Sequence, residues 1–490
     1  MSFSIRIILF AVLIVLFSCR KEDQIFDSPS AKLQFSTDSI SFDTVFTTVG
    51  TSTELFMVYN PYKEAVKISE IKLRGGNQST FRINVDGRSG TTHKDIMLAP
   101  NDSMFVFVEA TVDPNNQSKP FVIDDEVVFT TNGNRQEVKL VAWGQNAIYF
   151  TPTTFSNVFP DYSCLTGPCS DILPPVDVHW TDSLPIVIYG YVVIDSLDKL
   201  TIDKGAKIYF HNNGGLWVFR GGTLKVEGTK DEPVIFQGDR LDPFYSGRPG
   251  QWDRIWINEG GINDINYAII KNAFIGIQAE VFPFNDPPYD PAQLNISNTI
   301  IDNSSSVGLL SSIFKIKAEN LLITNSGDHA AVLRSGGEYS FTHCSFANYF
   351  SAANRETPSF LIQNSFTNAL GSQLLGTPRV KFYNSILDGK LKDEFDVEVV
   401  NNGSVDLDFQ NSILKTQYNT SDVNQFKNIY KNPSAGIFAN PYNGDFELDD
   451  NSPAIDKGEP SFGNLVPLDL KENDRTTDGH PDLGVYEYQP

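Results

Sequence analysis

The sequence has little that would form α-helices or bind nucleic acid. After the first twenty residues, stretches rich in Ala, Leu, Glu and Lys are almost absent, which argues against a helical fold. Its 38 Lys and Arg stand against 60 Asp and Glu, giving a formal net charge of −22 without a basic cluster. Such a chain is a poor partner for nucleic acid or anionic lipid headgroups. The 36 Phe, 18 Tyr, 35 Gly and 27 Pro instead indicate short β-strands separated by turns.

Familiar catalytic motifs are also missing. There is no H-E-x-x-H, G-x-S-x-G, Walker or G-x-G-x-x-G sequence. The six His are scattered, and no pair has the spacing of metal ligands. We therefore expect no bound cofactor, with a Ca²⁺ ion as the alternative considered below.

Cysteine is scarce, and its positions suit an exported protein. Cys164-Leu-Thr-Gly-Pro-Cys169 brackets a turn, so its two thiols are placed to form a small-loop disulfide. A redox or metal pair is the alternative, although four intervening residues do not match C-x-x-C and no His is near. Cys344 falls at a small-residue position of a repeat and is expected to be an inert packed thiol.

The first 18 residues have the pattern of a secretory signal. Arg6 precedes an apolar run that ends in Leu16-Phe-Ser-Cys19, and this run is too short to span a bilayer comfortably. The ending resembles the bacterial lipobox, which implies that Cys19 becomes the acylated first residue of the mature protein. Arg20-Lys-Glu-Asp23 resembles the surface-export tag of Bacteroidetes lipoproteins. These resemblances imply a lipid anchor in the outer membrane at the cell surface, the periplasmic face being the alternative, with residues 19–31 as a tether.

Residues 32–146 are predicted to form a β-sandwich. About seven segments alternate apolar and polar residues, and turns such as Asn60-Pro61 and Asn132-Gly133 separate them. The order of segments is similar to that of immunoglobulin-like ASPM/SPD-2/hydin modules, which implies a spacer or adhesion unit. The proline-rich residues 147–185 are predicted to be a linker that is pinned by the disulfide loop.

From about residue 200 to residue 414 the chain repeats itself every twenty-odd residues. Seven segments share a polar start, an apolar pair and a polar end at positions 272, 303, 325, 348, 368, 388 and 415. Such a period indicates a solenoid whose units bury their apolar faces against each other. The recurring Asn is expected to form an internal ladder, because Asn tolerates left-handed turns and hydrogen-bonds to its neighbours.

Three segments carry a family resemblance. Gln251-Trp-Asp-Arg-Ile-Trp-Ile257 with Tyr267-Ala-Ile-Ile-Lys-Asn272, and the closing Asn451-Ser-Pro-Ala-Ile-Asp456, closely resemble right-handed parallel β-helix proteins of the pectate-lyase-like superfamily. The predicted fold is thus all-β: an N-terminal β-sandwich, then a right-handed single-stranded parallel β-helix over residues 186–450 with about ten coils. Residues 451–490 are expected to close it.

Functional residues are harder to identify. Trp217, Trp252, Phe282 and Tyr289 are candidate sugar-stacking residues, because aromatic rings present flat apolar surfaces. The superfamily also contains lyases, and Lys271, Arg254 and Arg334 are the candidates for a base and for neutralising a uronate. The superfamily's hydrolase signature is absent. We therefore expect non-catalytic carbohydrate binding or adhesion; a polysaccharide lyase and a ligand-free spacer are the alternatives.

The closing segment is strongly acidic. Asp474, Asp478 and Asp482, with Asp469 and Glu487, have the oxygen ligands that Ca²⁺ prefers. We favour the other interpretation, a polar cap that ends the solenoid and prevents edge pairing.

Overall fold

The structure of the protein is a computed structural model. It describes residues 24–47, 50–51, 53–113, 121–169, 174–242, 244–259, 261–281, 293–368, 371–477 and 479–489. Cys19 with the signal segment, and also Phe282, Tyr289 and Asp478, lie outside these residues. The chain forms two compact units, residues 1–146 and 147–490. Within the described residues, no helix has both the length and the apolar character needed to cross a membrane.

The first unit is a β-sandwich of two five-stranded sheets around one apolar core. The strands of one sheet, in spatial order, are β1 (Gln34–Phe35), β3 (Glu54–Tyr59), β8 (Ser103–Ala110), β5 (Phe81–Val85) and β6 (Arg88–Gly90). Those of the other are β2 (Ser39–Phe46), β10 (Asn134–Gln145), β9 (Phe121–Thr131), β4 (Val66–Leu73) and β7 (Thr92–Leu98). Alternating residues of each strand face the core, as in Phe81-Arg-Ile-Asn-Val85, whose apolar members are buried. A short 3₁₀ turn, η1 (Gly76–Gln78), precedes β5.

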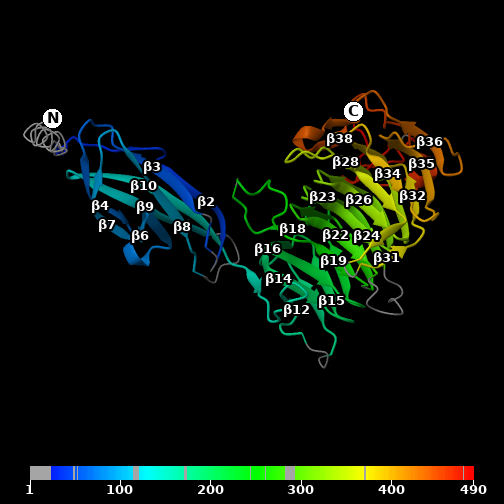
Figure 1. Cartoon of the computed structure of the whole chain (residues 1–490), viewed down its shortest axis with the longest axis horizontal. Helices are drawn as coiled ribbons and strands as arrows, with labels where there is room; N and C mark the ends of the chain where they lie inside the picture. Colours follow the sequence, from blue (N-terminus) through cyan, green and yellow to red (C-terminus); the bar gives the residue numbers. More distant parts are fainter. Residues whose placement is uncertain are drawn as a thin grey trace, which may run out of the picture. The chain divides into compact units, whose positions relative to one another are not determined.

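The second unit is a parallel β-helix with three sheets, here called faces 1, 2 and 3. Successive coils appear in Figure 1 as stacked arrows from β12 to β36. Several long strands bend and contribute to two faces: β14 (Ile186–Ile194), β16 (Lys207–Val218), β23 (Gln293–Asp302), β25 (Lys315–Thr324), β35 (Asp406–Leu414) and β36 (Phe426–Lys431).

The remaining strands each belong to one face. Face 1 adds β11 (Ile148–Phe150), β18 (Val234–Gly238), β21 (Ala268–Lys271), β28 (Ser345–Asn348) and β33 (Ile386–Gly389). Face 2 adds β12 (Tyr162–Cys164), β19 (Ile255–Asn258), β22 (Ile275–Glu280), β24 (Val307–Ser312), β26 (His329–Arg334), β29 (Phe360–Gln363) and β34 (Phe395–Glu398). Face 3 adds β13 (Asp177–Trp180), β15 (Lys199–Asp203), β17 (Thr223–Glu227), β20 (Ile262–Asn266), β27 (Glu338–Thr342) and β32 (Arg379–Tyr383). With β23, β25, β35 and β36, face 3 has ten strands, in agreement with the expected number of coils.

Identical positions of successive coils form apolar columns inside the helix. Ile270, Ile301, Ile323 and Phe346 pair one above the other on face 1, and all four are fully buried. The recurrent Ile and Phe of the repeats therefore fill the interior, as predicted.

Asparagines stack at the bend between faces 3 and 1. Asn298 and Asn320 both have positive φ, and Asn320 Nδ2 donates to Asn298 Oδ1 at 2.9 Å. A second stack follows face 1, where Asn303 Nδ2 donates to Asn272 Oδ1 at 2.7 Å. These bonds satisfy polar groups of residues that the left-handed bend requires. The asparagines therefore form the predicted ladder.

One predicted repeat is not part of the stack. Residues 363–368 match the local pattern, but Ser365–Thr367 is strand β30, which pairs antiparallel with β31 (Gln373–Leu375) in a hairpin. The next stacked strand on face 1 after β28 is β33. Because the pattern is local, it does not identify the strand partner, and this assignment was wrong.

The predicted linker also proved to be part of the solenoid. Residues 147–185 supply β11, β12 and β13, which pair in parallel with β14 and β15. The prolines of this region lie between three- and four-residue strands rather than in a spacer.

The closing segment lies along the side of the helix instead of over its end. The β37 (Phe438–Asn440) and β38 (Asp445–Leu448) hairpin, with η2 (Pro441–Asn443) between its strands, precedes this segment, which itself contains the short helix α2 (Pro460–Gly463). Phe446, Leu470 and Val485 pack against outward-facing Leu322 and Ile386 of face 1. The expectation of a cap at the end of the solenoid was therefore wrong in position.

Candidate functional site

The structure brings two of the three predicted lyase residues onto one face. Arg254 immediately precedes β19 and Arg334 ends β26, so both belong to face 2. Lys271 ends β21 on face 1. The base and the two arginines therefore do not form the expected trio.

A chain of hydrogen bonds runs across the outer surface of face 2. We call it the face-2 polar line; it consists of Tyr191, Asp253, Arg254, Gln278 and Glu280. The Tyr191 hydroxyl donates a hydrogen bond to Asp253 Oδ2. Arg254 Nη2 donates to the other carboxylate oxygen, Asp253 Oδ1, at 2.7 Å. Arg254 Nη1 donates to Gln278 Oε1, and Gln278 Nε2 donates to Glu280 Oε1 at 2.9 Å. The line thus carries polar contacts from β14 to β22.

Strand register explains why these side chains meet. Trp256 of β19 pairs with Gln278 of β22, and on the next outward position Glu280 pairs with Ser312, which in turn pairs with Arg334. Side chains at equivalent positions of parallel neighbours point to the same side, so these groups form two adjacent outward columns. Trp256 Nε1 adds a second hydrogen bond to Glu280 Oε1 at 2.9 Å.

Glu280 is a buried acid of this surface. Burial raises the pKa of its carboxyl above the ordinary value, while the hydrogen bonds from Trp256 and Gln278 and the charges of Arg334 and Arg254 act in the opposite direction. Both hydrogen bonds reach Oε1, and no described residue donates to Oε2. A buried acid with an open oxygen next to two guanidinium groups is typical of functional sites.

Arg334 is held in place but keeps hydrogen-bonding capacity. Its Nε donates to Ser312 Oγ at 2.8 Å, and its guanidinium lies 4.1 Å from the ring centroid of Phe366 in the β30–β31 hairpin. Its two Nη groups find no hydrogen-bond acceptor among the residues that the structure describes. Burial lowers the pKa of Arg334, and Glu280 opposes this shift. A guanidinium that is held by ring stacking and has both Nη groups available is suited to bind a carboxylate through two parallel hydrogen bonds.

An apolar strip adjoins these polar groups. Ile275, Val307, Leu310, Val332 and Leu361 form one cluster on the outer side of face 2, and all are buried. These side chains pack against each other on the outer side of the sheet and leave the polar groups as the accessible part of face 2.

The predicted stacking residues Trp217 and Trp252 are not exposed. Trp217 is 7 % exposed and stacks on Trp256, with ring centroids 4.7 Å apart. Trp252 is 1 % exposed, stacks on Phe210 inside the helix, and donates its Nε1 to the carbonyl of Lys271. For these two residues the expectation of a sugar platform was wrong.

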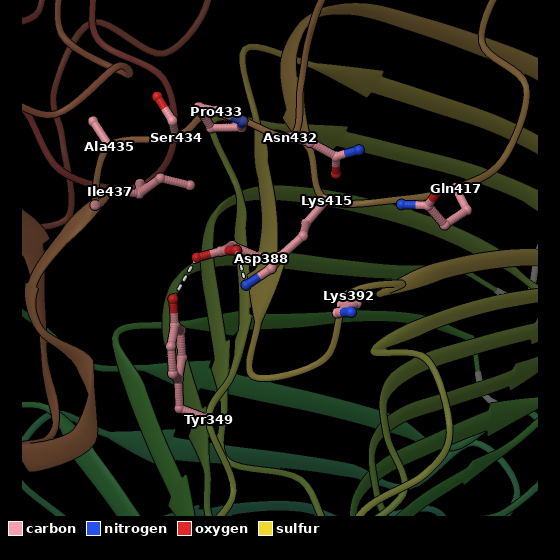
Figure 2. A pocket seen from close by; sticks show the side chains of 11 residues that line it. Tyr349, Asp388, Lys392, Lys415, Gln417, Asn432, Pro433, Ser434, Ala435 and Ile437 are labelled. Carbon is pink, nitrogen blue, oxygen red and sulfur yellow. Dashed lines mark hydrogen bonds and ion pairs between the residues drawn. The ribbon is translucent and has the colours of Figure 1, made fainter.

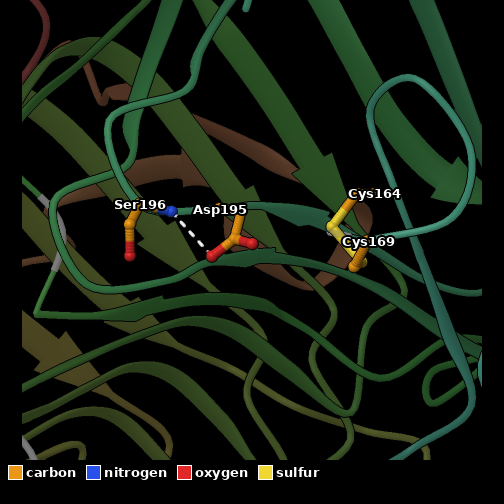
Figure 3. The surroundings of a disulfide bond; sticks show 4 residues. All are labelled: Cys164, Cys169, Asp195 and Ser196. Carbon is orange, nitrogen blue, oxygen red and sulfur yellow. Dashed lines mark hydrogen bonds between the residues drawn. A yellow bond between two sulfur atoms is a disulfide. The ribbon is translucent and has the colours of Figure 1, made fainter. Parts of the chain in front are cut away.

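The disulfide lies at the beginning of face 2. Cys164 and Cys169 are joined with an S–S distance of 2.05 Å, and Figure 3 shows the bond near Asp195 and Ser196. Cys164 packs with Val193 and Trp217 on the outer side of the sheet. The bond therefore holds a loop over the first coils. Cys344 is buried, and its burial raises the thiol pKa to about 12, which keeps it protonated and inert.

The acidic closing segment uses its carboxylates internally. Asp469 accepts hydrogen bonds from the backbone of Lys471, Asn473 and Glu487, and Asp482 accepts from Asp456 and Tyr488. Fully buried Arg475 pairs with Glu487 at 3.2 Å. Asp474 is exposed and accepts from Thr476. No group of three His, Cys, Asp or Glu among the described residues could hold a metal ion. Asp469 and Asp482 are thus engaged in internal hydrogen bonds, whereas the candidate Asp478 lies outside the described residues, and the Ca²⁺ alternative stays a prediction.

Glu280 and Gln278 were missed by sequence reasoning. Gln278-Ala-Glu280 does show polar residues two apart beside apolar ones, which is the pattern of an outward column. Assigning this column to the same face as Arg254 and Arg334 required the strand register.

Comparisons with known proteins give no family. No family model and no curated protein matches the chain. Among solved structures, the Agl-KA catalytic domain matches with 10% identity and a TM-score of 0.28, covering 78% of this chain and 80% of that chain. A family 123 glycoside hydrolase from Clostridium perfringens matches with 5% identity and a TM-score of 0.18. The match covers 24% of this chain and 28% of the hydrolase chain. The ASH/PapD-like domain of human CEP192 matches with 12% identity and a TM-score of 0.17, covering 26% of this chain and 94% of that domain. These scores are too low to support any statement about function.

Proposed function

We propose that this protein is a lipid-anchored cell-envelope protein whose β-helix binds an acidic polysaccharide on face 2 without cleaving it. The observation that carries the proposal is Arg334: a half-buried, stacked guanidinium with free Nη donors, on the same face as Arg254. Arginine forks match the geometry of a carboxylate, the group that distinguishes a uronate from a neutral sugar. The rigid coils would present this recognition site while the sandwich acts as a spacer.

Binding is favoured over cleavage because Lys271, the base of the lyase hypothesis, lies on face 1. One observation supports the lyase alternative: burial raises the pKa of Glu280, which lies beside both arginines and is suited to proton transfer. In that case Glu280 would replace Lys271 as the acid–base group.

Calorimetric titration with polygalacturonate, and with neutral dextran as a control ligand, tests the binding proposal. We expect polygalacturonate alone to bind, and Arg334→Ala to weaken binding by about tenfold or more, since a charge-assisted hydrogen bond contributes about 1.5–3 kcal/mol. Arg379→Ala, which removes an exposed arginine of face 3, is the matched control and should bind normally. Equal binding of dextran, or an unchanged affinity in Arg334→Ala, would refute the proposal.

The same polymer distinguishes binding from cleavage. A lyase generates unsaturated chain ends that absorb in the ultraviolet. If such ends form with the wild type and not with Glu280→Gln, the lyase alternative is correct and the non-catalytic proposal falls.

The membrane anchor follows from the Leu16-Phe-Ser-Cys19 pattern. In cells fed labelled palmitate, the wild type should carry the label and Cys19→Ser should not. Incorporation that survives this substitution would show that Cys19 is not the acylated residue.

A further inference from the structure

A cavity of about 440 Å³ lies on the side of the helix formed by face 1, away from the face-2 polar line. One wall consists of three outward side chains: Tyr349, which follows β28; Asp388, which lies within β33; and Lys415, which follows β35. The opposite wall is the segment 432–437, where the chain leaves the last coil. In Figure 2, Ser434 lies on one side of Asp388, and Lys392 and Gln417 lie on the other.

The single carboxylate that lines this cavity is already neutralised. Lys415 Nζ lies 3.3 Å from Asp388 Oδ1, and the Tyr349 hydroxyl donates to Asp388 Oδ2. Burial, together with the charge of Asp388, raises the pKa of Tyr349 far above its ordinary value, so the phenol stays protonated and adds no negative charge. Lys415 is further fixed by a hydrogen bond to the carbonyl of Gly389.

Lys392 leaves the cavity with excess positive charge. It contributes one charge and Lys415 another, against one negative charge on Asp388, so the lining carries a net +1. No described residue pairs with the Lys392 ammonium. Asp393, its sequence neighbour, does not line the cavity, and its Oδ1 accepts from Thr416 Oγ1 and from the backbone of Gln417. This positive site stands out on a chain whose formal charge is −22.

Neutral hydrogen-bonding groups surround the two lysines. The side-chain amide of Gln417 and the hydroxyl of Ser434 have no partner among the residues that the structure describes. Asn432 is different: its amide binds the backbone of Thr416 through both of its atoms, at 2.8 Å each, and this fixes the rim. The volume falls within the range of small-molecule sites.

We propose that this cavity binds a small, hydroxyl-bearing anion of about the size of a sugar acid or a sugar phosphate. Lys392 would hold the anionic group, with Lys415 adding attraction, while Gln417 and Ser434 would bind the hydroxyls. Lysine provides a point charge that suits either a carboxylate or a phosphate. The site is separate from face 2, and the proposal does not depend on polysaccharide binding there.

Calorimetric titration of the full chain with D-glucuronate, glucose 6-phosphate and D-glucose tests this site. We expect at least one of the two anions to bind, with an affinity that falls as salt is added, and glucose to show no binding. Which anion binds more tightly identifies the carboxylate or the phosphate as the preferred group. Failure of both anions to bind, or equal binding of glucose, would overturn the proposal.

Substitutions locate the binding. Lys392→Ala should lower affinity by about tenfold, the effect of losing one charge-assisted hydrogen bond. Because Lys392 is exposed and unpaired, the variant should fold like the wild type, which circular dichroism would check. Lys390→Ala is the matched control, being exposed but not part of the lining, and Arg334→Ala tests whether the anion binds on face 2 instead. Loss of binding in either of these two variants, or unchanged binding in Lys392→Ala, would refute the assignment.

Discussion

At the scale of single residues, His343 occupies a place in the asparagine ladder where a charge cannot be accommodated. It is fully buried with a φ of 52°, and its Nε2 lies 3.1 Å from Asn384 Nδ2, which donates to it. Burial lowers the pKa of His343 well below its ordinary value, and the nearby charge of Arg475 acts in the same direction. The ring is therefore neutral in the folded protein.

This predicts a loss of stability in acid. In the unfolded chain His343 takes up a proton near its ordinary pKa, whereas in the folded protein it does not. Its contribution to the free energy of unfolding is therefore fully present above about pH 6.5 and is lost as the pH falls below that value. In His343→Asn the residue matches its ladder neighbours and cannot titrate. Urea unfolding at pH 7.5 and pH 5 should therefore show a smaller acid-induced loss in the variant. Equal losses in the two proteins would mean that His343 is not the responsible group.

At the scale of elements, the ladder places residues that tolerate positive φ at the bend between faces 3 and 1 of successive coils, among them Asn298, Asn320 and Asn384. Asn298 has a φ of 48°, donates to Asn266 Oδ1 at 3.0 Å, and accepts from Asn320. Both its backbone conformation and its amide thus contribute to stacking.

Two substitutions separate these contributions. Asn298→Gly removes the amide but keeps the bend at no steric cost, whereas Asn298→Ala also forces a Cβ into the left-handed region, which costs about 1–2 kcal/mol. We expect Asn298→Ala to lower the free energy of unfolding by about 1 kcal/mol more than Asn298→Gly does, as measured in urea. An alanine variant as stable as the glycine variant would contradict this role of the bend.

Local sequence predicted those features of the fold that depend on local chemistry. Ile301 and Asn303 make the repeat visible in the sequence, because Ile301 must be buried in the interior and Asn303 must adopt the left-handed conformation at the bend. Phe366 has the same local context but belongs to a hairpin, since the pattern does not specify a strand partner. Trp252 is flanked by polar residues and was expected at the surface, whereas register places it on Phe210 in the core.

Predicting the candidate site on face 2 requires knowledge of the strand register even more than predicting the fold does. Arg254 and Arg334 are 80 residues apart, and only the pairing of β19, β22, β24 and β26 brings them to one surface with Glu280. The cavity at Lys392 requires the return of the segment 432–437 to face 1, for which the sequence contains no local signal.

At the scale of the whole molecule, the sandwich and the β-helix have separate cores. We therefore expect each unit to unfold cooperatively on its own. A fragment of residues 24–146 should fold and should melt at the temperature of the matching transition in the full chain, as followed by calorimetry. An unfolded fragment, or a single transition of the full chain that fits one two-state unit, would show that the units are energetically coupled.

The position of the closing segment has a consequence for how the molecule is made. Ile386 and Leu322 on the flank of face 1 are covered by Leu470, Leu483 and Val485, which are synthesised after the coils that they cover. Until those residues are in place, the folded coils expose an apolar surface on this flank, which is prone to associate with other chains. The closing segment therefore covers this flank only at the end of synthesis, and a prematurely terminated chain would leave the flank exposed and be prone to aggregate.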